Sequence, residues 1–271
     1  MKLKTIIIGI VCGLALVSTT PATERLFTYT YEPETLPKGA VEAEQWMTVR
    51  SGRNSAVGKE NFRRVQFREE IEYGVTDNYQ LSLYFNHQYE SYKDPATGKT
   101  RTDYRQKGIS IENKLMVWNP ADHDVGLSLY LEPTYDGKDF ELEQKIILGQ
   151  RWNDWKWALN FSHATEWRND FKNKVGEFEV SFGATRELDS NWSLGFEMRH
   201  HAEIKEYKDW EGYALYLGPV VSYRRDNWWA TLSVMPQIYG ANFNGDPDGV
   251  HALELEGHEK INVRLLIGFS F

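Results

Sequence analysis

Apolar and polar residues alternate along most of this chain, and this alternation limits its fold more than any other feature of the sequence. The C-terminal stretch is the plainest case. Its apolar face holds Ile261, Val263, Leu265, Ile267, Phe269 and Phe271, while the residues between them are of mixed type. Residues two apart lie on one face of a β-strand, whereas a helical face repeats about every 3.6 residues. No helical period persists after residue 22, so the pattern predicts an all-β protein.

Twelve stretches of the chain carry this alternation. Each is close to the ~9–11 residues that a tilted strand needs to cross a bilayer, and some are longer. The predicted strands are 40–50, 62–74, 79–91, 108–118, 125–135, 139–152, 155–167, 176–186, 192–201, 212–224, 228–239 and 259–271. An even number of strands brings both ends of the chain to the same side of the membrane, which is expected to be the periplasm.

The connections between the predicted strands alternate in length. Short ones are expected at 74–78, 119–124, 153–154, 187–191 and 225–227, and longer polar ones at 51–61, 92–107, 168–175, 202–211 and 240–258. Only 136–138 departs from the rule. Short turns on one side and long loops on the other are typical of outer-membrane barrels. The sequence therefore predicts a transmembrane antiparallel β-barrel of about 12 strands.

The first residues form the only stretch that resembles a hydrophobic helix. Lys2 and Lys4 precede an apolar run over 5–17, and Thr20 and Ala22 supply small residues at the two positions that a signal peptidase reads. This pattern predicts a signal peptide at 1–22. The barrel domain is then 23–271, with 23–39 as a periplasmic segment ahead of the first strand.

The composition excludes several function classes. The formal net charge of −8 argues against nucleic acid as a partner, because phosphate binding needs clustered Lys and Arg. The single cysteine, Cys12, lies in the predicted signal peptide, so the mature chain is expected to have no thiol or disulfide. A mean hydropathy of −0.57 argues against a helical-bundle membrane protein.

Alternation alone does not separate a membrane barrel from a soluble sandwich or a lipocalin-like barrel. The strand count, the final Phe271 and the aromatic strand ends favour the membrane. Six tryptophans lie beside predicted turns, where an interfacial belt is expected: Trp152, Trp155, Trp157, Trp192, Trp228 and Trp229. Phe269 and Phe271 are predicted to form the C-terminal signal that the barrel-assembly machinery recognises.

The polar face of each strand of a membrane barrel lines the lumen. The lining residues expected from the strand registers are charged, and carboxylates outnumber basic side chains. They are Glu42, Glu44, Arg68, Glu70, Glu72, Glu112, Lys114, Glu141, Glu143, Lys145, Glu179, Glu197, Arg199 and Arg264. Such a lining either surrounds a water-filled channel that favours cations or pairs into a network that fills a narrow lumen. Glu69 and Asn113 fall on the lipid face, and a β-bulge is the expected reason.

No combination of nucleophile, base and orienting group is visible in the sequence. The nearest match to the His-x-Ser pair of twelve-stranded phospholipase barrels is His163-Ala164-Thr165. His200 and His201 alternate faces and are not expected to share a metal, and no Cys/His cluster has zinc spacing. The oxygen-bearing residues over 242–249 could suit calcium, but the same residue types also make turns. We therefore predict no catalytic residues, no cofactor and no metal.

Three motifs carry a resemblance to known proteins. They are Glu34-Thr-Leu-Pro-Lys-Gly39, Glu42-Ala-Glu-Gln-Trp46 and Glu72-Tyr-Gly-Val-Thr-Asp77. Through them the mature chain resembles uncharacterised proteobacterial outer-membrane proteins, and it is similar to the channel-like barrels associated with phenol degradation. The resemblance implies the passage of a small solute and supplies no catalytic residues.

These observations predict a porin-like channel, not an enzyme, in the outer membrane of a Gram-negative bacterium. A small polar or aromatic solute is expected to cross a narrow acidic lumen, while outer-membrane lipid surrounds the barrel. The alternatives are a lipid-modifying enzyme at the outer rim and a closed structural barrel.

Overall fold

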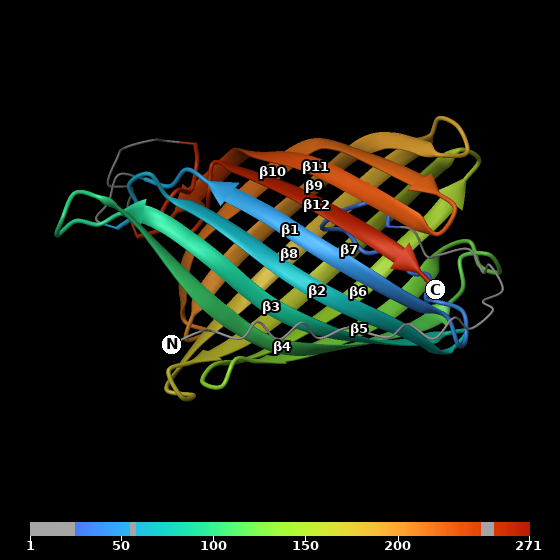
Figure 1. Cartoon of the computed structure of the whole chain (residues 1–271), viewed down its shortest axis with the longest axis horizontal. Helices are drawn as coiled ribbons and strands as arrows, with labels where there is room; N and C mark the ends of the chain where they lie inside the picture. Colours follow the sequence, from blue (N-terminus) through green and yellow to red (C-terminus); the bar gives the residue numbers. More distant parts are fainter. Residues whose placement is uncertain (1–24, 55–57, 245–251) are drawn as a thin grey trace, which may run out of the picture.

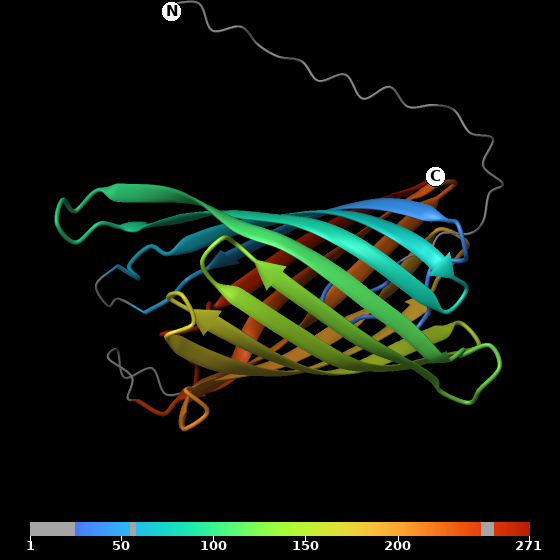
Figure 2. The same ribbon diagram turned by 90° about the horizontal axis from the view of Figure 1, so that it is seen from below.

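The structure is a computed structural model that describes residues 25–54, 58–244 and 252–271. The predicted signal peptide and part of the 242–249 loop lie outside the described residues. Twelve antiparallel strands pair in chain order, and the last strand pairs with the first, which closes the sheet into a barrel (Figures 1 and 2). The predicted fold class is confirmed. No described residue belongs to a helix that could cross a membrane.

The observed strands follow the predicted ranges closely, with one exception. They are β1 (Val41–Ser51), β2 (Arg63–Thr76), β3 (Tyr79–Lys93), β4 (Thr100–Trp118), β5 (Gly126–Tyr135), β6 (Phe140–Trp152), β7 (Trp155–Arg168), β8 (Asn173–Glu187), β9 (Trp192–Lys205), β10 (Asp209–Arg225), β11 (Trp228–Asn242) and β12 (Ile261–Ser270). The exception is β4, which starts eight residues before the predicted 108. Its early residues continue the pairing with β3 as a long hairpin that projects from one end of the barrel (Figure 1).

The two ends of the barrel differ in their connections. We call the end that carries the C-terminus and the connections 77–78, 119–125, 153–154, 188–191 and 226–227 the turn end, and the opposite end the loop end. Asn153 and Asp226 open two-residue turns with left-handed φ values of 51° and 54°, which Asn and Asp tolerate better than most residues. The loop-end connections 169–172 and 206–208 are shorter than predicted, because their polar neighbours extend the strands.

The two faces of the sheet have opposite character. Large apolar side chains such as Ile71, Leu83, Ile111, Leu131 and Leu194 are exposed on the outer face. The alternate residues point inward and are mainly polar or charged. A closed sheet that is apolar outside and polar inside matches the architecture of transmembrane barrels and is the reverse of a soluble barrel.

Glu69 and Asn113 lie on the outer face without the expected bulge. The pairing of β1, β2 and β3 around Glu69 is regular. The Glu69 carboxylate instead accepts a hydrogen bond of 3.1 Å from Gln45 and lies 3.4 Å from His87 Nδ1, while Asn113 Oδ1 accepts one of 2.8 Å from Tyr79. Neighbouring polar side chains on the outer face therefore contact these groups, and the bulge prediction was wrong.

The chain before β1 lies inside the barrel. In both views the first described residues run as a blue coil within the turn-end half of the barrel (Figures 1 and 2). Leu26, Phe27, Tyr29, Tyr31 and Leu36 are all buried there. The segment that was expected in the periplasm therefore occupies the lumen over its described part. We call residues 25–37 the lumenal segment.

Candidate functional site in the barrel lumen

The structure places all of the predicted lining residues on the inward faces of their strands. Glu42, Glu44, Glu70, Glu72, Glu112, Lys114, Glu197 and Arg199 are buried, and Arg68, Glu141, Glu143, Lys145, Glu179 and Arg264 are half-buried. Some of them bond across the lumen. Arg68 on β2 donates a hydrogen bond of 2.5 Å to Glu132 on β5, a strand that is not its neighbour in the sheet. How these residues act on a solute stays a prediction.

One tryptophan of the predicted interfacial belt lies in the lumen. Trp152, Trp155 and Trp192 are exposed on the outer face near the turn end. Trp229, in contrast, is 1% exposed, and its indole donates a hydrogen bond of 3.0 Å to Glu42 inside the barrel. The sequence Trp228-Trp229 puts one ring on each face, so the prediction for Trp229 was wrong. At the C-terminus, Phe269 is exposed on the outer face and the Phe271 amide bonds to the Val41 carbonyl.

A single carboxylate anchors the middle of the lumenal segment. Glu197 on β9 is fully buried and accepts hydrogen bonds from three successive amides: Thr28 at 3.0 Å, Tyr29 at 2.9 Å and Thr30 at 3.0 Å. The Thr28 hydroxyl donates a fourth at 2.8 Å. Backbone amides that converge on one anion bind it strongly, at roughly 1.5–3 kcal/mol for each bond to a charged group.

Side chains on other strands hold the rest of the segment, and several of them are uncharged. Asn160 on β7 bonds to both main-chain groups of Tyr31, since its Oδ1 accepts from the amide at 2.6 Å and its Nδ2 donates to the carbonyl at 2.8 Å. Gln80 on β3 accepts from the Leu36 amide at 2.9 Å. The segment itself contains no strand, so side chains of the wall take the place of a β-ladder.

The wall is also shaped to receive one ring of the segment. Phe27 is fully buried against Gly183 on β8, where an added Cβ atom would lie 2.4 Å from the ring. Leu26, Ala158 and Val220 complete the apolar cluster around it. A glycine on the inward face of a strand therefore makes room for the segment.

Cations stacked on aromatic rings form one layer of the lumen. The Arg25 guanidinium lies 4.0 Å from the ring centroid of Tyr31 and 4.5 Å from that of Trp46. Lys145 Nζ lies 4.2 Å from the Tyr31 ring, and Arg68 lies 3.9 Å from the Tyr84 ring. Such contacts each contribute about 0.5–2 kcal/mol. Arg25 and Tyr31 were not among the predicted lining residues, because no strand was predicted before residue 40; Trp46 and Tyr84 were not among them because only charged side chains were assigned to the lining.

Several buried polar atoms in this layer have no protein partner, which indicates water. None of the three Arg25 guanidinium nitrogens forms a hydrogen bond with a described residue. A cavity of about 300 Å³ borders Arg25, and its walls include Glu72, Glu112, Lys114 and Lys156. Buried charged groups without protein partners are normally hydrated. We therefore infer that the turn-end half of the lumen is hydrated.

Five carboxylates crowd the same half of the lumen on β1, β2 and β4. They are Glu42, Glu44, Glu70, Glu72 and Glu112, and among the described residues none of them forms an ion pair. Neutral side chains donate hydrogen bonds to some of them, such as the Trp46 indole to Glu44 at 2.7 Å and the Tyr84 hydroxyl to Glu112 at 2.5 Å. The group therefore gathers carboxylates on one side of the turn-end lumen.

The loop end is charged as well, and several of its charges form ion pairs. Arg64 lies 2.9 Å from Glu90, and Arg53 lies 2.7 Å from Glu259. Burial opposes the ionisation of Glu259, yet Arg50, Arg53 and Arg64 hold the pKa of its carboxyl below the ordinary value. At this mouth of the lumen, Arg53 therefore links the chain after β1 to Glu259, shortly before β12.

A chain of two histidines and two glutamates lies at the loop-end mouth. His201 on β9 bonds through Nδ1 to His258 Nε2 at 2.8 Å, and through Nε2 to Glu177 at 3.2 Å. His258 Nδ1 bonds to Glu254. Burial would raise the pKa of Glu254, but the bond with His258 and the amides of Gly257 and Glu256 hold it at about 2. Burial lowers the pKa of His258 itself, despite the opposing effect of Glu254.

The predicted weak candidate for catalysis does not form a catalytic pair. His163 Nε2 lies 2.8 Å from the hydroxyl of Tyr207, and the Thr165 hydroxyl bonds to that same oxygen. Both residues point to the outer face of β7, where Tyr207 covers them. No described base contacts Thr165, so this cluster lacks the partner that would activate a hydroxyl nucleophile.

A family match covers nearly the whole barrel. Residues 19–147 and 152–271 match a family of unknown function, DUF6662. The chain belongs to this family. No curated protein matches the sequence.

Solved structures show the same architecture at low sequence identity. The COG4313 outer membrane channel from Pseudomonas putida F1 superposes with a TM-score of 0.63 at 11% identity, covering 90% of this chain and 100% of that one. The NanC porin gives a TM-score of 0.53 at 10% identity, with 84% and 100% covered. The KdgM porin, solved in complex with disordered oligogalacturonate, gives 0.51 at 8% identity, with 85% and 99% covered. At these identities the likeness establishes the fold.

Proposed function

We propose that this protein is a bacterial outer-membrane channel for small polar or aromatic solutes, and that its lumenal segment is the constriction. The observation that carries the proposal is a closed barrel with a charged interior that holds its own N-terminal residues by side-chain hydrogen bonds. Because β1 and β12 close the sheet without the segment, its departure from the lumen would leave every strand pair intact. The turn end, which carries the C-terminus, would face the periplasm.

The lining supports selectivity by charge and by ring stacking. The unpaired carboxylates at the turn end favour cations or solutes with hydrogen-bond donors. The stacked layer of Arg25, Tyr31 and Trp46 offers flat surfaces to a planar or aromatic solute. The structural neighbours described as channels and porins share this architecture and agree with the proposal.

Single-channel conductance tests the proposal directly. The mature barrel and a variant that lacks residues 25–37 are refolded in detergent and inserted into planar bilayers. We expect small conductance steps with cation preference from the intact barrel, and steps several-fold larger from the shortened one. The shift in gel mobility between unboiled and boiled samples verifies that both barrels are folded.

Two results would overturn parts of this proposal. Silence from both proteins after verified insertion would mean a closed structural barrel. Equal conductance from both would mean that ions pass elsewhere and that the lumenal segment is not the constriction. Lipid turnover by the purified barrel that His163→Ala abolishes would instead favour an enzyme.

A further inference from the structure

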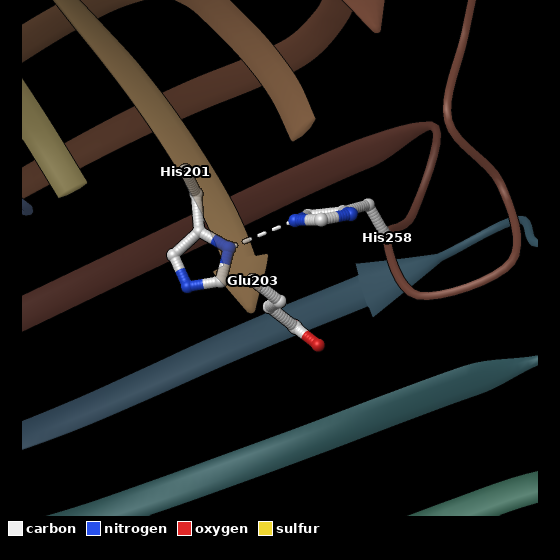
Figure 3. Close-up of side chains that lie close together, drawn as sticks. All are labelled: His201, Glu203 and His258. Atoms are coloured by element: carbon white, nitrogen blue, oxygen red, sulfur yellow. Dashed lines mark hydrogen bonds between the residues drawn. The ribbon is translucent and has the colours of Figure 1, made fainter. Parts of the chain in front are cut away.

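Three potential metal ligands meet at the loop-end mouth of the lumen (Figure 3). His201 and Glu203 come from the same face of β9, two residues apart, and His258 comes from the connection that precedes β12. One nitrogen of each ring and one Glu203 carboxylate oxygen all lie within 4.8 Å of one another. Both histidines are buried, so their contact is fixed by the fold rather than by chance encounter at the surface.

Each histidine also has a carboxylate on its other nitrogen. Glu177 lies 3.2 Å from His201 Nε2, and Glu254 bonds to His258 Nδ1. This leaves His201 Nδ1 and His258 Nε2 facing each other 2.8 Å apart. A carboxylate behind each imidazole is the arrangement that orients metal-binding histidines and raises their basicity.

The segment that carries His258 is held in place independently of any ligand. The Glu254 carboxylate accepts hydrogen bonds from the amides of Glu256 at 2.9 Å and His258 at 2.9 Å, and from Asn242 Nδ2 at 3.1 Å. The Glu254 amide bonds to Gln237 on β11 at 2.6 Å. The position of His258 over β9 is therefore built in advance, as a specific metal site requires.

Glu203 differs from the other carboxylates at this mouth. No described residue forms a hydrogen bond or an ion pair with it, whereas Glu177 and Glu254 both bond to a histidine. Glu203 is half-buried and lies on the lumenal face of β9. It can therefore supply an oxygen ligand without breaking a contact.

We propose that His201, Glu203 and His258 bind one Zn²⁺ ion at the outer mouth of the channel. Two imidazoles and one carboxylate suit zinc, and they leave a fourth tetrahedral position for water. Nitrogens bound to one tetrahedral zinc lie roughly 3.3 Å apart, so the two rings need to separate by about half an ångström. The bound ion would fasten the connection before β12 to β9, at the opposite end of the lumen from the lumenal segment.

Zinc titration of the purified barrel tests the site. The folded protein in detergent is stripped with EDTA, dialysed, and titrated with ZnCl₂ by calorimetry, with bound metal counted by mass spectrometry. We expect one zinc per chain, and binding at least 100-fold weaker in His201→Gln and in His258→Gln. Glu177→Gln keeps all three ligands, so its zinc affinity should fall by only about 10- to 100-fold.

His200→Gln is the matched control, because it makes the same change one residue away. His200 points to the outer face, where its ring lies 5.3 Å from that of Tyr213. X-ray absorption at the zinc edge gives a second readout, and two imidazoles in the coordination shell are expected.

The outcomes are distinct. No zinc binding by the folded barrel, or equal binding by the His201 and His258 variants, overturns the proposal. Zinc that is lost in Glu44→Gln and Glu72→Gln but kept in the histidine variants would move the site to the turn-end carboxylates and also overturn it. Gel mobility before and after boiling verifies that each variant is folded.

Discussion

The two halves of the lumen satisfy their charges in different ways. At the loop end the charged side chains bond to one another, as in Arg64–Glu90 and Arg53–Glu259. At the turn end the polar side chains of the wall bond to a peptide that is not part of the sheet, as Glu197 and Asn160 do. The nearby carboxylates Glu44 and Glu70 form no ion pair with a described residue.

This difference separates a part of the lumen that is built into the barrel from a part that can change. An ion pair between strands, such as Arg64–Glu90, persists for as long as the strands pair. Hydrogen bonds to the lumenal segment can be lost without breaking the sheet, so the turn end is where an open and a closed state can differ. The predictions below test this contrast in order of decreasing effect.

The largest effect is expected from Glu197→Gln. The side-chain amide keeps one acceptor oxygen and puts a donor in place of the other; where that donor replaces Oε1, the bonds from the Tyr29 and Thr30 amides are lost. Losing about 3 kcal/mol of the free energy that holds the segment shifts the equilibrium between bound and released segment about a hundredfold toward release. Single-channel recording should show larger or longer openings. Glu90→Gln, which removes the same charge at the loop end, should leave the openings unchanged; equal effects of both would contradict the contrast.

Gly183→Leu should displace the segment by steric means alone. The new side chain occupies the place of the Phe27 ring, and overpacking of this kind costs about 1–3 kcal/mol. The expected result is a larger mean conductance with the selectivity retained. Adding Phe27→Ala frees the space and should restore the small steps. If the double variant behaves like Gly183→Leu, the displacement explanation is wrong.

Neutralising the turn-end carboxylates should alter selectivity more than conductance. The triple change Glu44→Gln, Glu70→Gln and Glu112→Gln removes carboxylates that form no ion pair with a described residue, so most of the cation preference should disappear. The measurement is the reversal potential in a salt gradient. Glu90→Gln serves again as the control, because Arg64 already offsets its charge. An unchanged reversal potential in the triple variant would mean that ions do not pass these carboxylates.

The smallest effect is expected at a turn outside the lumen. The Asp189 carboxylate accepts hydrogen bonds from the amides of Asn191 and Trp192, and these hold its pKa below 3.8. A carboxyl whose pKa is lowered by folding stabilises the folded protein at pH values above its ordinary pKa. That contribution is lost as the pH falls through the lowered pKa of the folded state. Asp189→Asn should therefore lower the thermal unfolding midpoint slightly at pH 7 and hardly at pH 3. A difference that grows toward acid would contradict this assignment.

The barrel itself could be predicted because its signal is repeated twelve times. Alternation fixes which residues face lipid, and one misplaced strand would not change the conclusion. The same logic failed where two tryptophans are adjacent, because proximity to a turn does not tell which ring faces inward. It also failed at Glu69, where the outer face carries its own polar partners and no register shift is needed.

The lumenal segment and the histidine site could not be predicted from local pattern. Phe27, Tyr29 and Tyr31 alternate with threonines like a strand, yet they pair with side chains that are distant in sequence. The only usable signal was that such an apolar stretch is costly to leave in water. His258 meets His201 only because Glu254 folds the connection back over β9, and no spacing rule reports a contact of that kind.

The lumenal segment is continuous with β1, so it stays covalently tethered to the barrel when it leaves the lumen. Residues 25–40 are sixteen in number and span at most roughly 55 Å when fully extended. A released segment therefore stays near the mouth it left, at an effective concentration in the millimolar range. Re-entry is then much faster than capture of any dilute molecule. A separate peptide with the sequence of 25–37 would have to be supplied at about millimolar concentration to take its place.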